Sequence, residues 1–394
     1  MSKKQTRKVE RPAEAGTSDD LATDDHATDD YATGKRATGE RATDDAIAAS
    51  STTINASSPT IATSTSPIAA SSTTAARHSL LPLVIVNPAS AGGATSRAWP
   101  RLASELSTHF GAFTCAFTER AGDASVIAAR EAEAGRSLIV ACGGDGTISE
   151  VANGILRSGA DAELGILPSG TGGDFKRTLD VPLRGRDAAE ALREGRTVRL
   201  DVGRVRFQDR EGARAERYFL NVASCGMGGE VIRRVEENSA GWLASASRRI
   251  AGGQAAYALA SLQAAVSFAR PTLRIQLDER PEFRLAVVNL CIANARYFGG
   301  GMKIAPAAKL SDGLLDVVAV GALDTRKILT NVYRLYLGTH LGMREVKHAH
   351  ARRISVSADK LSEQVLIEID GELAGTLPAT FEILPRALRV RVPA

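Results

Sequence analysis

The sequence predicts an α/β domain with a doubly wound parallel sheet, followed by a mainly antiparallel β domain. Three observations lead to this prediction. Over residues 80–200, apolar runs of strand length alternate with helical patterns, which is typical of parallel sheets covered by helices on both faces. Three of these strands end in glycine-rich loops. After Asp201, strand-like runs follow one another with few helices between them, as in antiparallel sheets.

The segment before the first domain, residues 1–79, is expected to be disordered. It contains a pentapeptide array between Ala22 and Ala46, followed by a tract rich in Ser, Thr and Ala. Such a composition has too few large apolar side chains to offset the entropy that a chain loses on folding.

The α/β domain, residues 80–200, is predicted to begin with a buried strand, LPLVIVNP (81–88), which Asn-Pro ends. The elements expected after it are, in order, a helix over about 95–109, a strand over 113–119, a helix over 123–135, a strand and loop over 137–147, a helix over 148–159, and a strand with its loop over 163–175. Gly135 and Gly159 are expected to end two of these helices.

The second domain, residues 201–384, is predicted from short apolar runs separated by turn residues. The strand-like runs cover 217–224, 272–278, 285–293, 315–320, 352–358 and 364–370, and two helical stretches cover about 242–268 and 324–338. The C-terminal segment, 385–394, carries one more strand-like run. Whether it returns to the first domain stays open.

Charge and composition exclude several classes of protein. The chain of 394 residues has a formal net charge of +4, which fits anionic ligands or an anionic lipid surface but is too weak for a nucleic-acid-binding protein. No signal peptide is recognisable, and the longest uncharged run, 250–269, is mostly alanine with polar residues inside it. We therefore expect a cytoplasmic protein with no transmembrane segment.

The cysteines and the C-terminal histidines are not predicted to bind a metal. The four cysteines, Cys115, Cys142, Cys225 and Cys291, lie far apart and form no CxxC pair, so we expect small buried side chains in a reducing compartment. His348 and His350 lie near His340, but no acidic or cysteine pattern accompanies them, and no metal site is predicted there.

Three glycine loops follow strands of the first domain, at the sheet edge where open parallel sheets bind ligands. They are NPASAGG (87–93), GGDGT (143–147) and PSGTGGDF (168–175). Glycine lets backbone N–H groups approach phosphate oxygens closely, and the helix after GGDGT adds its positive dipole end. The chain has no GxxxxGK[ST] and no GxGxxG at its first helix, so ordinary P-loop and dinucleotide sites lack their signatures.

The polar residues of the GGDGT loop have more than one interpretation. Thr147 and Glu150 form T-x-x-E, which is either a helix capping box or a pair of ligand contacts. Asp145 would repel phosphate unless its carboxylate meets Mg²⁺ or accepts a proton from an attacking hydroxyl. Asp145 is therefore predicted to be functional.

Six segments of the chain form a recognisable set, in this order: NPASAGG, GGDGTISEVANGI, LPSGTGGDFKRTLDVP, FLNVASCGMGG, GGGMKIAPAAKLSDGLLDVV and IDGE. Together they resemble the diacylglycerol kinase catalytic family, and more narrowly its soluble bacterial lipid kinases, relatives of sphingosine and ceramide kinases. The resemblance covers the chain from about residue 81 to the C-terminus. GGDGT alone is shared with NAD kinases and phosphofructokinases, whereas its combination with the GTGxDF loop and the AxxxDGxLD stretch is specific to lipid kinases.

The resemblance implies a two-domain enzyme that holds ATP between the α/β domain and a β-sandwich, and that transfers the γ-phosphate to a hydroxyl of a lipid such as diacylglycerol. By position it implies nucleotide contacts from Asn87, Thr118, Gly143, Gly144, Asp145, Gly146, Thr147, Glu150, Gly170 and Thr171. It implies a structural Mg²⁺ held by the carboxylate of Asp312 and the backbone carbonyls of Lys309 and Leu314.

The resemblance also places the catalytic base in or near IDGE, which contains Asp370 and Glu372. Our order of preference for the base is Glu372, then Asp145, then Asp370, and the sequence alone does not decide between them. At Asp312 and Asp370 the Asp-Gly pair is also an ordinary turn signal.

Gly173 departs from the family pattern, which usually has Asn in this place. We interpret the change as variation rather than inactivation, because Asp174 and Phe175 remain. Two alternatives stay open: a soluble-substrate kinase of the NAD kinase type, and a non-catalytic lipid- or nucleotide-binding relative. The expected partner is a lipid at a membrane surface, contacted transiently, with an apolar cleft around residues 224–265. No nucleic acid is expected, and homodimer formation is left open.

Overall fold

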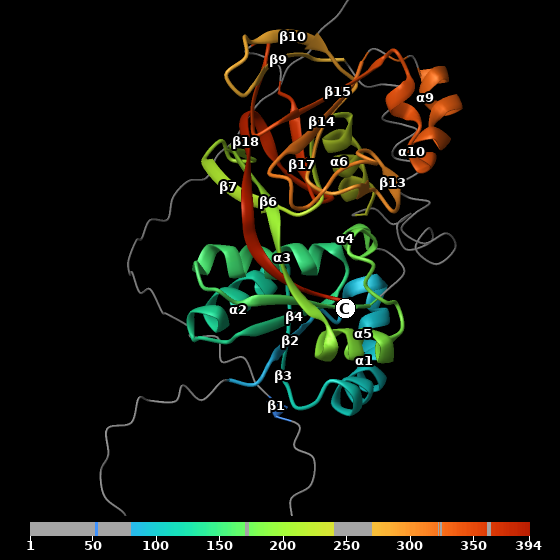
Figure 1. Cartoon of the computed structure of the whole chain (residues 1–394). Coiled ribbons are helices and arrows are strands. Elements are labelled where there is room, and N and C mark those ends of the chain that lie inside the picture. Colours follow the sequence, from blue (N-terminus) through green and yellow to red (C-terminus); the bar gives the residue numbers. More distant parts are fainter. Residues whose placement is uncertain are drawn as a thin grey trace, which may run out of the picture. The chain divides into compact units, whose positions relative to one another are not determined.

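The computed structural model describes residues 52–53, 80–169, 173–239, 270–321, 323, 325–360 and 364–394 (Figure 1). The predictions made for Gly170, Thr171 and the helix over 242–268 lie outside the described residues, as does most of the N-terminal segment 1–79. Within that segment, Thr52–Thr53 form a short strand, β1, that pairs antiparallel with β3, which departs from the disorder expected there.

The first domain is a parallel sheet covered by helices, as the sequence predicts. Its elements are β2 (Leu83–Val86), α1 (Ser90–His109), β3 (Thr114–Phe117), α2 (Asp123–Glu133), β4 (Leu138–Gly143), α3 (Asp145–Ser158), β5 (Glu163–Pro168), α4 (Asp174–Thr178) and α5 (Gly185–Glu194). The strand order is β3-β2-β4-β5, and all neighbours are parallel.

Helices pack on both faces of this sheet, because successive residues of its buried strands point to opposite sides. On one face, Ile85, Ile139 and Ile166 pack with apolar residues of α2 and α3. On the other face, Val86 and Val140 pack with residues of α1 and α5 (Figure 1). The carboxyl ends of β2, β4 and β5 thereby bring the described parts of the three glycine loops to one edge.

The second domain is a mainly antiparallel β-sandwich, as expected. Its elements are β6 (Arg196–Asp209), β7 (Arg214–Phe219), β8 (Val222–Gly226), α6 (Met227–Ser239), β9 (Thr272–Leu277), β10 (Phe283–Ala286), β11 (Asn289–Ala293), β12 (Tyr297–Phe298), β13 (Met302–Lys303), β14 (Leu315–Val320), α9 (Thr325–Asn331), α10 (Tyr333–Leu337), the 3₁₀ turn η1 (His340–Gly342), β15 (Val346–Ala351), β16 (Arg353–Ala358), β17 (Leu366–Ile369) and β18 (Glu372–Val392). A core that includes Phe219 and Phe381, whose rings meet edge to face at 6.5 Å, fills the sandwich.

Two long strands, β6 and β18, run through both cores. Leu200 and Val202 of β6 belong to the core of the first domain, while Val205 of the same strand belongs to the sandwich core. The predicted boundary between residues 200 and 201 therefore falls inside a strand. At its C-terminal end, β18 pairs parallel with β5 through Arg389 and Val390, so the C-terminal segment adds a strand to the first sheet.

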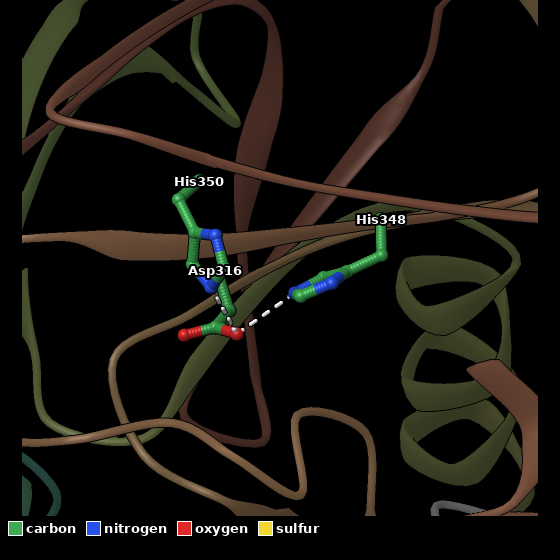
Figure 2. Close-up of side chains that lie close together, drawn as sticks. All are labelled: Asp316, His348 and His350. Carbon is green, nitrogen blue, oxygen red and sulfur yellow. Dashed lines mark hydrogen bonds and ion pairs between the residues drawn. The ribbon is translucent and has the colours of Figure 1, made fainter.

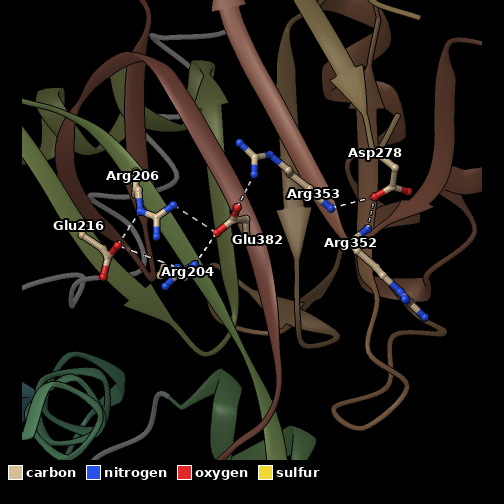
Figure 3. A network of polar contacts seen from close by, with 7 residues as sticks. All are labelled: Arg204, Arg206, Glu216, Asp278, Arg352, Arg353 and Glu382. Atoms are coloured by element: carbon tan, nitrogen blue, oxygen red, sulfur yellow. Dashed lines mark hydrogen bonds and ion pairs between the residues drawn. The ribbon is translucent and has the colours of Figure 1, made fainter. Parts of the chain in front are cut away.

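A surface network of ion pairs joins three strands of the sandwich (Figure 3). The carboxylate of Glu382 on β18 accepts hydrogen bonds from Arg204 of β6 at 2.6 Å and from Arg353 of β16 at 2.9 Å. Arg206 of β6 reaches the same carboxylate at 3.4 Å. The guanidinium of Arg204 holds the pKa of Glu382 below its usual range.

Several elements differ from the sequence prediction. The helix expected over 324–338 is two short helices, α9 and α10, and Gly338 ends the second with a left-handed backbone. The sequence analysis did not predict α5, α6 or β15. None of the helices in the described ranges combines the length and the apolar character that crossing a membrane requires. All four cysteines are buried and free, as expected.

Candidate nucleotide and catalytic site

The GGDGT segment is the junction between β4 and α3. Gly144 is the N-cap residue of α3, has an extended backbone with φ −93°, and makes no side-chain capping bond. The capping-box interpretation of Thr147 and Glu150 is therefore wrong. A side chain is excluded at Gly143, where a Cβ would lie 2.4 Å from Oγ1 of Thr147. Among the described residues, no side chain caps the first N–H groups of α3, as in phosphate-binding helix termini.

The first glycine loop is tied to this junction by hydrogen bonds between side chains. Nδ2 of Asn87 donates to Oγ1 of Thr147 at 3.1 Å, and Oγ of Ser90 lies 3.3 Å from the same Oγ1. Oδ1 of Asn87 accepts from N–H of Ala89 at 3.1 Å. Ala91, Gly92 and Gly93 have left-handed φ values of 55°, 63° and 82°, so the regular part of α1 begins after them. Asn87 and Thr147, both predicted nucleotide contacts, therefore lie together.

Glu150 and Thr118, two further predicted nucleotide contacts, have structural partners. The two carboxylate oxygens of Glu150 accept hydrogen bonds from N–H of Gly122 at 3.0 Å and of Ala124 at 3.2 Å, which caps the start of α2. Thr118 is buried just after β3, where its N–H donates to the carbonyl of Val86 at 3.0 Å. A contact of either residue with nucleotide stays a prediction.

Asp145 connects the second glycine loop to the third. Its carboxylate accepts hydrogen bonds from N–H of Asp174 at 2.8 Å and of Phe175 at 3.2 Å, the first residues of α4. Asp174 in turn accepts from N–H of Gly300 at 2.9 Å and from Arg177 at 2.8 Å. Burial raises the pKa of Asp174. The structure thus gives Asp145 a helix-capping role that the sequence analysis did not foresee.

Gly173, the departure from the family pattern, has a conformation that suits glycine. Its φ is +127°, and a Cβ at this position would lie 2.5 Å from Cε of Lys176. The aliphatic chain of Lys176 therefore fills the space into which an Asn side chain would extend. Lys176 is buried, which lowers its pKa, while the nearby charge of Asp145 acts in the opposite direction.

Glu372, the first residue of β18, lies beside the GGDGT junction. A Cβ added at Gly146 would stand 3.4 Å from Oε1 of Glu372. The other oxygen, Oε2, pairs with Nη2 of Arg217 on β7 at 2.5 Å. The side chain of Glu372 is 45% exposed, so solvent reaches this carboxylate. The fold thereby brings together Gly146 and Glu372, which are far apart in the sequence.

Asp370 has a different environment, although it is only two residues away. Its carboxylate accepts hydrogen bonds from N–H of Leu220 at 2.9 Å, of Asn221 at 2.9 Å and of Val222 at 3.2 Å, and from the hydroxyl of Ser149 at 3.1 Å. Asp370 and Gly371 have positive φ values of 50° and 90° and form the turn between β17 and β18. Four donors on one carboxylate favour the turn interpretation of Asp370 over that of a catalytic base.

Asp312 lies on an exposed loop before β14. Its Oδ1 accepts from N–H of Leu314 at 3.1 Å, and Asp201 fixes the loop by accepting from N–H of Gly313 at 2.7 Å. The carboxylate of Asp312 and the backbone carbonyls of Lys309 and Leu314 offer only oxygen atoms as ligands, and Mg²⁺ prefers oxygen ligands.

The sequence analysis missed three residues of this site: Arg217, Lys176 and Glu368. Glu368 is buried, accepts from the hydroxyl of Ser224 at 2.7 Å, and has its pKa raised to about 7 by burial. Arg217 stands two residues before the FLNVAS segment, and Lys176 directly after GTGGDF. Their proximity to recognised motifs was the only available signal.

Comparisons with known proteins agree with this architecture. Residues 82–205 match the family model described as diacylglycerol kinase catalytic domain, and residues 236–392 match the one described as YegS C-terminal NAD kinase beta sandwich-like domain. Proteins named diacylglycerol kinase are similar over most of the chain. The one from Bacillus subtilis (strain 168) is 30% identical over 290 residues, 73% of this chain and 86% of that protein. The one from Mycobacterium tuberculosis (strain ATCC 25618 / H37Rv) is 31% identical over 275 residues, 69% of this chain and 82% of that protein.

A solved structure has the same fold. The crystal structure of a diacylglycerol kinase from Bacillus anthracis str. Sterne superposes with a TM-score of 0.57 at 22% sequence identity. The superposition covers 79% of this chain and 96% of that one.

Proposed function

Because the chain belongs to the diacylglycerol kinase family, we propose that it is an ATP- and Mg²⁺-dependent lipid kinase. It moves the γ-phosphoryl group of ATP to a hydroxyl of a lipid such as diacylglycerol. The observation that carries the proposal is the position of Glu372, whose Oε1 lies 3.4 Å from the Cβ position of Gly146. An accessible carboxylate beside a phosphate-type glycine loop is what phosphoryl transfer to an alcohol requires.

The chain's own residues would act mainly by positioning. The uncapped N–H groups at the start of α3 hold phosphate oxygens, with Asn87 and Thr147 fixing the loop. Asp145 keeps α4 and the third glycine loop beside them. Bound Mg²⁺ supplies positive charge that offsets the charge of the phosphates, and Asp312 with the carbonyls of Lys309 and Leu314 would hold a structural ion.

Glu372 would be the base. It takes the proton of the lipid hydroxyl as the hydroxyl oxygen bonds to the γ-phosphorus, while the bond from that phosphorus to the oxygen bridging to the β-phosphate breaks. Arg217 orients Glu372 through Oε2 and leaves Oε1 for the substrate. Asp370 is not assigned this role, because its carboxylate already accepts four hydrogen bonds.

The region of α9 and α10 would contact the membrane that carries the lipid. Val332, Tyr333, Tyr336 and Leu337 are exposed, with exposed fractions between 44% and 64%. The segment 325–337 contains Arg326, Lys327 and Arg334 and no acidic residue. Exposed aromatic and aliphatic side chains with basic neighbours are typical of helices that lie in a membrane interface.

A transfer assay tests the proposed function. The purified full chain is given ATP labelled in the γ-phosphate, Mg²⁺, and in separate reactions diacylglycerol, sphingosine or ceramide in mixed micelles, or NAD in solution. We expect labelled lipid from the wild type and at least about a hundredfold less from Glu372→Gln, the lower range for loss of a general base. Glu279→Gln, at an exposed glutamate of the β9–β10 turn, is the matched control.

Two outcomes would overturn the proposal. Label in NAD and in none of the lipids would identify a soluble-substrate kinase. Binding of ATP without transfer to any acceptor would identify a non-catalytic relative.

A further inference from the structure

A second cluster of metal-ligating side chains lies in the sandwich, on β14 and β15 (Figure 2). Nε2 of His348 donates a hydrogen bond to Oδ1 of Asp316 at 2.9 Å, and Nε2 of His350 lies 3.4 Å from the same oxygen. The ligand atoms of the three side chains all lie within 4.8 Å of one another. Figure 2 shows the two imidazoles directed at one carboxylate.

The pairing of the two strands brings these residues together. Asp316 is the register partner of His350, and Val318 that of His348, in an antiparallel ladder. Residues two apart on a strand point to the same face, so His348 and His350 both stand beside Asp316. The sequence pattern around the histidines does not reveal their acidic partner. That partner is Asp316, on a strand about thirty residues earlier.

We propose that Asp316, His348 and His350 form a binding site for one divalent transition metal of the zinc class. Two imidazoles and a carboxylate suit Zn²⁺, Co²⁺, Ni²⁺ or Cu²⁺, whereas Mg²⁺ and Ca²⁺ prefer oxygen ligands. A Zn²⁺ ion about 2.0–2.1 Å from each ligand, at tetrahedral angles, sets ligand atoms about 3.3 Å apart. The carboxylate-to-imidazole distances of 2.9 and 3.4 Å are already close to that spacing.

Burial and exposure at the cluster suit an ion that enters from solvent. The side chain of Asp316 is 4% exposed, so its charge is held almost out of water and needs a positive partner. The side chains of His348 and His350 are 26% and 49% exposed, which leaves room for their rings to turn and for water to complete the coordination. In the loaded state each imidazole would carry its proton on Nδ1 and bind through Nε2.

A metal bound at this site would fix β15 to β14. In the described sheet, β15 is the last strand of its path and pairs with β14 alone. A metal bound to Asp316 on β14 and to both histidines on β15 would crosslink the two strands. Because the metal binds the folded chain, it should raise the unfolding temperature. The proposal does not depend on the lipid kinase activity.

Cobalt binding tests the proposal. The purified full chain is freed of metal with a chelator, exchanged into buffer and titrated with Co²⁺, whose visible absorption reports imidazole coordination. We expect one Co²⁺ per chain, displaced by Zn²⁺ and not by Mg²⁺. His350→Gln should weaken Co²⁺ binding by more than about a hundredfold, since loss of even a supporting contact around a metal costs about 10–100-fold in affinity.

Three controls make the outcome specific. His109→Gln removes a histidine outside the cluster, and Asp312→Ala removes the carboxylate of the Mg²⁺ loop, and both variants should bind Co²⁺ like the wild type. His350→Gln should match the unfolding temperature of the wild type in chelator, because this side chain is the most exposed of the three. Equal Co²⁺ affinity in the wild type and in His350→Gln, or loss of binding in Asp312→Ala, would overturn the assignment.

Discussion

The two carboxylates of the IDGE hairpin differ in their partners, and this difference is the basis for proposing a structural role for Asp370 and a catalytic role for Glu372. The carboxylate of Asp370 accepts four hydrogen bonds, three of them from the backbone N–H groups that lead from β7 into β8. The carboxylate of Glu372 pairs with one arginine, and its side chain is 45% exposed. Sequence spacing alone treats both as members of one acidic element.

We therefore expect opposite results from two isosteric substitutions. Asp370→Asn turns an amide NH₂ toward backbone N–H donors, and a buried donor left without an acceptor costs about 1–3 kcal/mol. This variant should unfold at a lower urea concentration. Glu372→Gln should unfold like the wild type and bind ATP normally, but turn over at least about a hundredfold more slowly. Urea unfolding and the lipid transfer assay check both. Normal turnover in Glu372→Gln would return the base assignment to Asp145.

Glu368 makes stability depend on pH near neutrality. Burial raises its pKa from 4.5 to about 7, so the folded chain keeps a proton that the unfolded chain releases. The stability that this proton contributes is fully present below about pH 4.5 and is lost as the pH rises to about 7. At about 1.4 kcal/mol per pKa unit, the free energy of unfolding falls by roughly 3 kcal/mol over this range.

Glu368→Gln should remove this pH dependence. The amide keeps the size of the side chain and can still accept from N–H of Gly371, but it does not titrate. Urea unfolding midpoints are measured from pH 5 to pH 8. As the pH rises, the midpoints of the wild type and of Glu279→Gln should fall more steeply than the midpoint of Glu368→Gln. Parallel curves for all three proteins would mean that Glu368 keeps an ordinary pKa.

At the scale of elements, Asp145 stabilises a helix that is too short to be stable alone. α4 has five residues, fewer than an isolated helix needs, and its first two N–H groups donate to Asp145. Asp145→Asn leaves one oxygen for two donors, so amide exchange over 174–178 should rise while the global unfolding midpoint changes little. Lipid phosphorylation should fall at least about a hundredfold, because Asp174 and Phe175 are no longer held beside the GGDGT junction. Asp180→Asn, at an exposed residue just after α4, is the matched control. Unchanged exchange in α4 would contradict the capping role.

The elements that the sequence predicts well are those with a continuous apolar signal. β2, β4 and β5 are buried on both faces and consist almost wholly of apolar residues, so their positions follow from composition. β15 reads VKHAHA, and its alternating positions carry histidines that face Asp316, so no apolar alternation marks it as a strand.

The contacts of the site could not be predicted for a related reason. Asp145 and Asp370 are recognisable as acidic residues in motifs, but their partners are backbone N–H groups, which every residue except proline carries. Only the folded arrangement selects Leu220 or Asp174 as the donor. The same holds for Arg217, whose register on β7 places it beside Glu372.

The exposed face of α10 gives a prediction about membrane binding. Leu337 is 64% exposed, so Leu337→Ser should not affect folding. In a membrane interface a buried leucine contributes about 1.5–3 kcal/mol, so this change should weaken vesicle binding by about tenfold or more. Sedimentation with vesicles of phosphatidylcholine and phosphatidylglycerol measures it. Leu183→Ser, at a leucine that is 70% exposed before α5, is the matched control. Equal weakening by both variants would mean that α10 is not the docking element.

At the scale of the whole molecule, β6 and β18 make the two predicted domains depend on each other. The two strands pair antiparallel from Gly375 to Val392 of β18, and each contributes residues to both cores. Arg391 near the end of β18 pairs with the buried Glu163 of β5 at 2.8 Å. A division of the chain into consecutive domains misses this arrangement, because the last strand of the sequence completes the first sheet.

We therefore expect a substitution near the C-terminus to destabilise both domains at once. Leu388 on β18 is 1% exposed in the core of the first domain, and Leu388→Ala should cost about 2–5 kcal/mol through lost burial and the cavity left behind. Since β18 continues into the sandwich, amide exchange should rise in β2, β4 and β5 and also in β6 and β16. Hydrogen exchange followed by mass spectrometry resolves these strands separately, and Leu337→Ala, at an exposed leucine, controls for loss of the side chain alone. Faster exchange confined to β2–β5 would show that the domains unfold independently despite the shared strands.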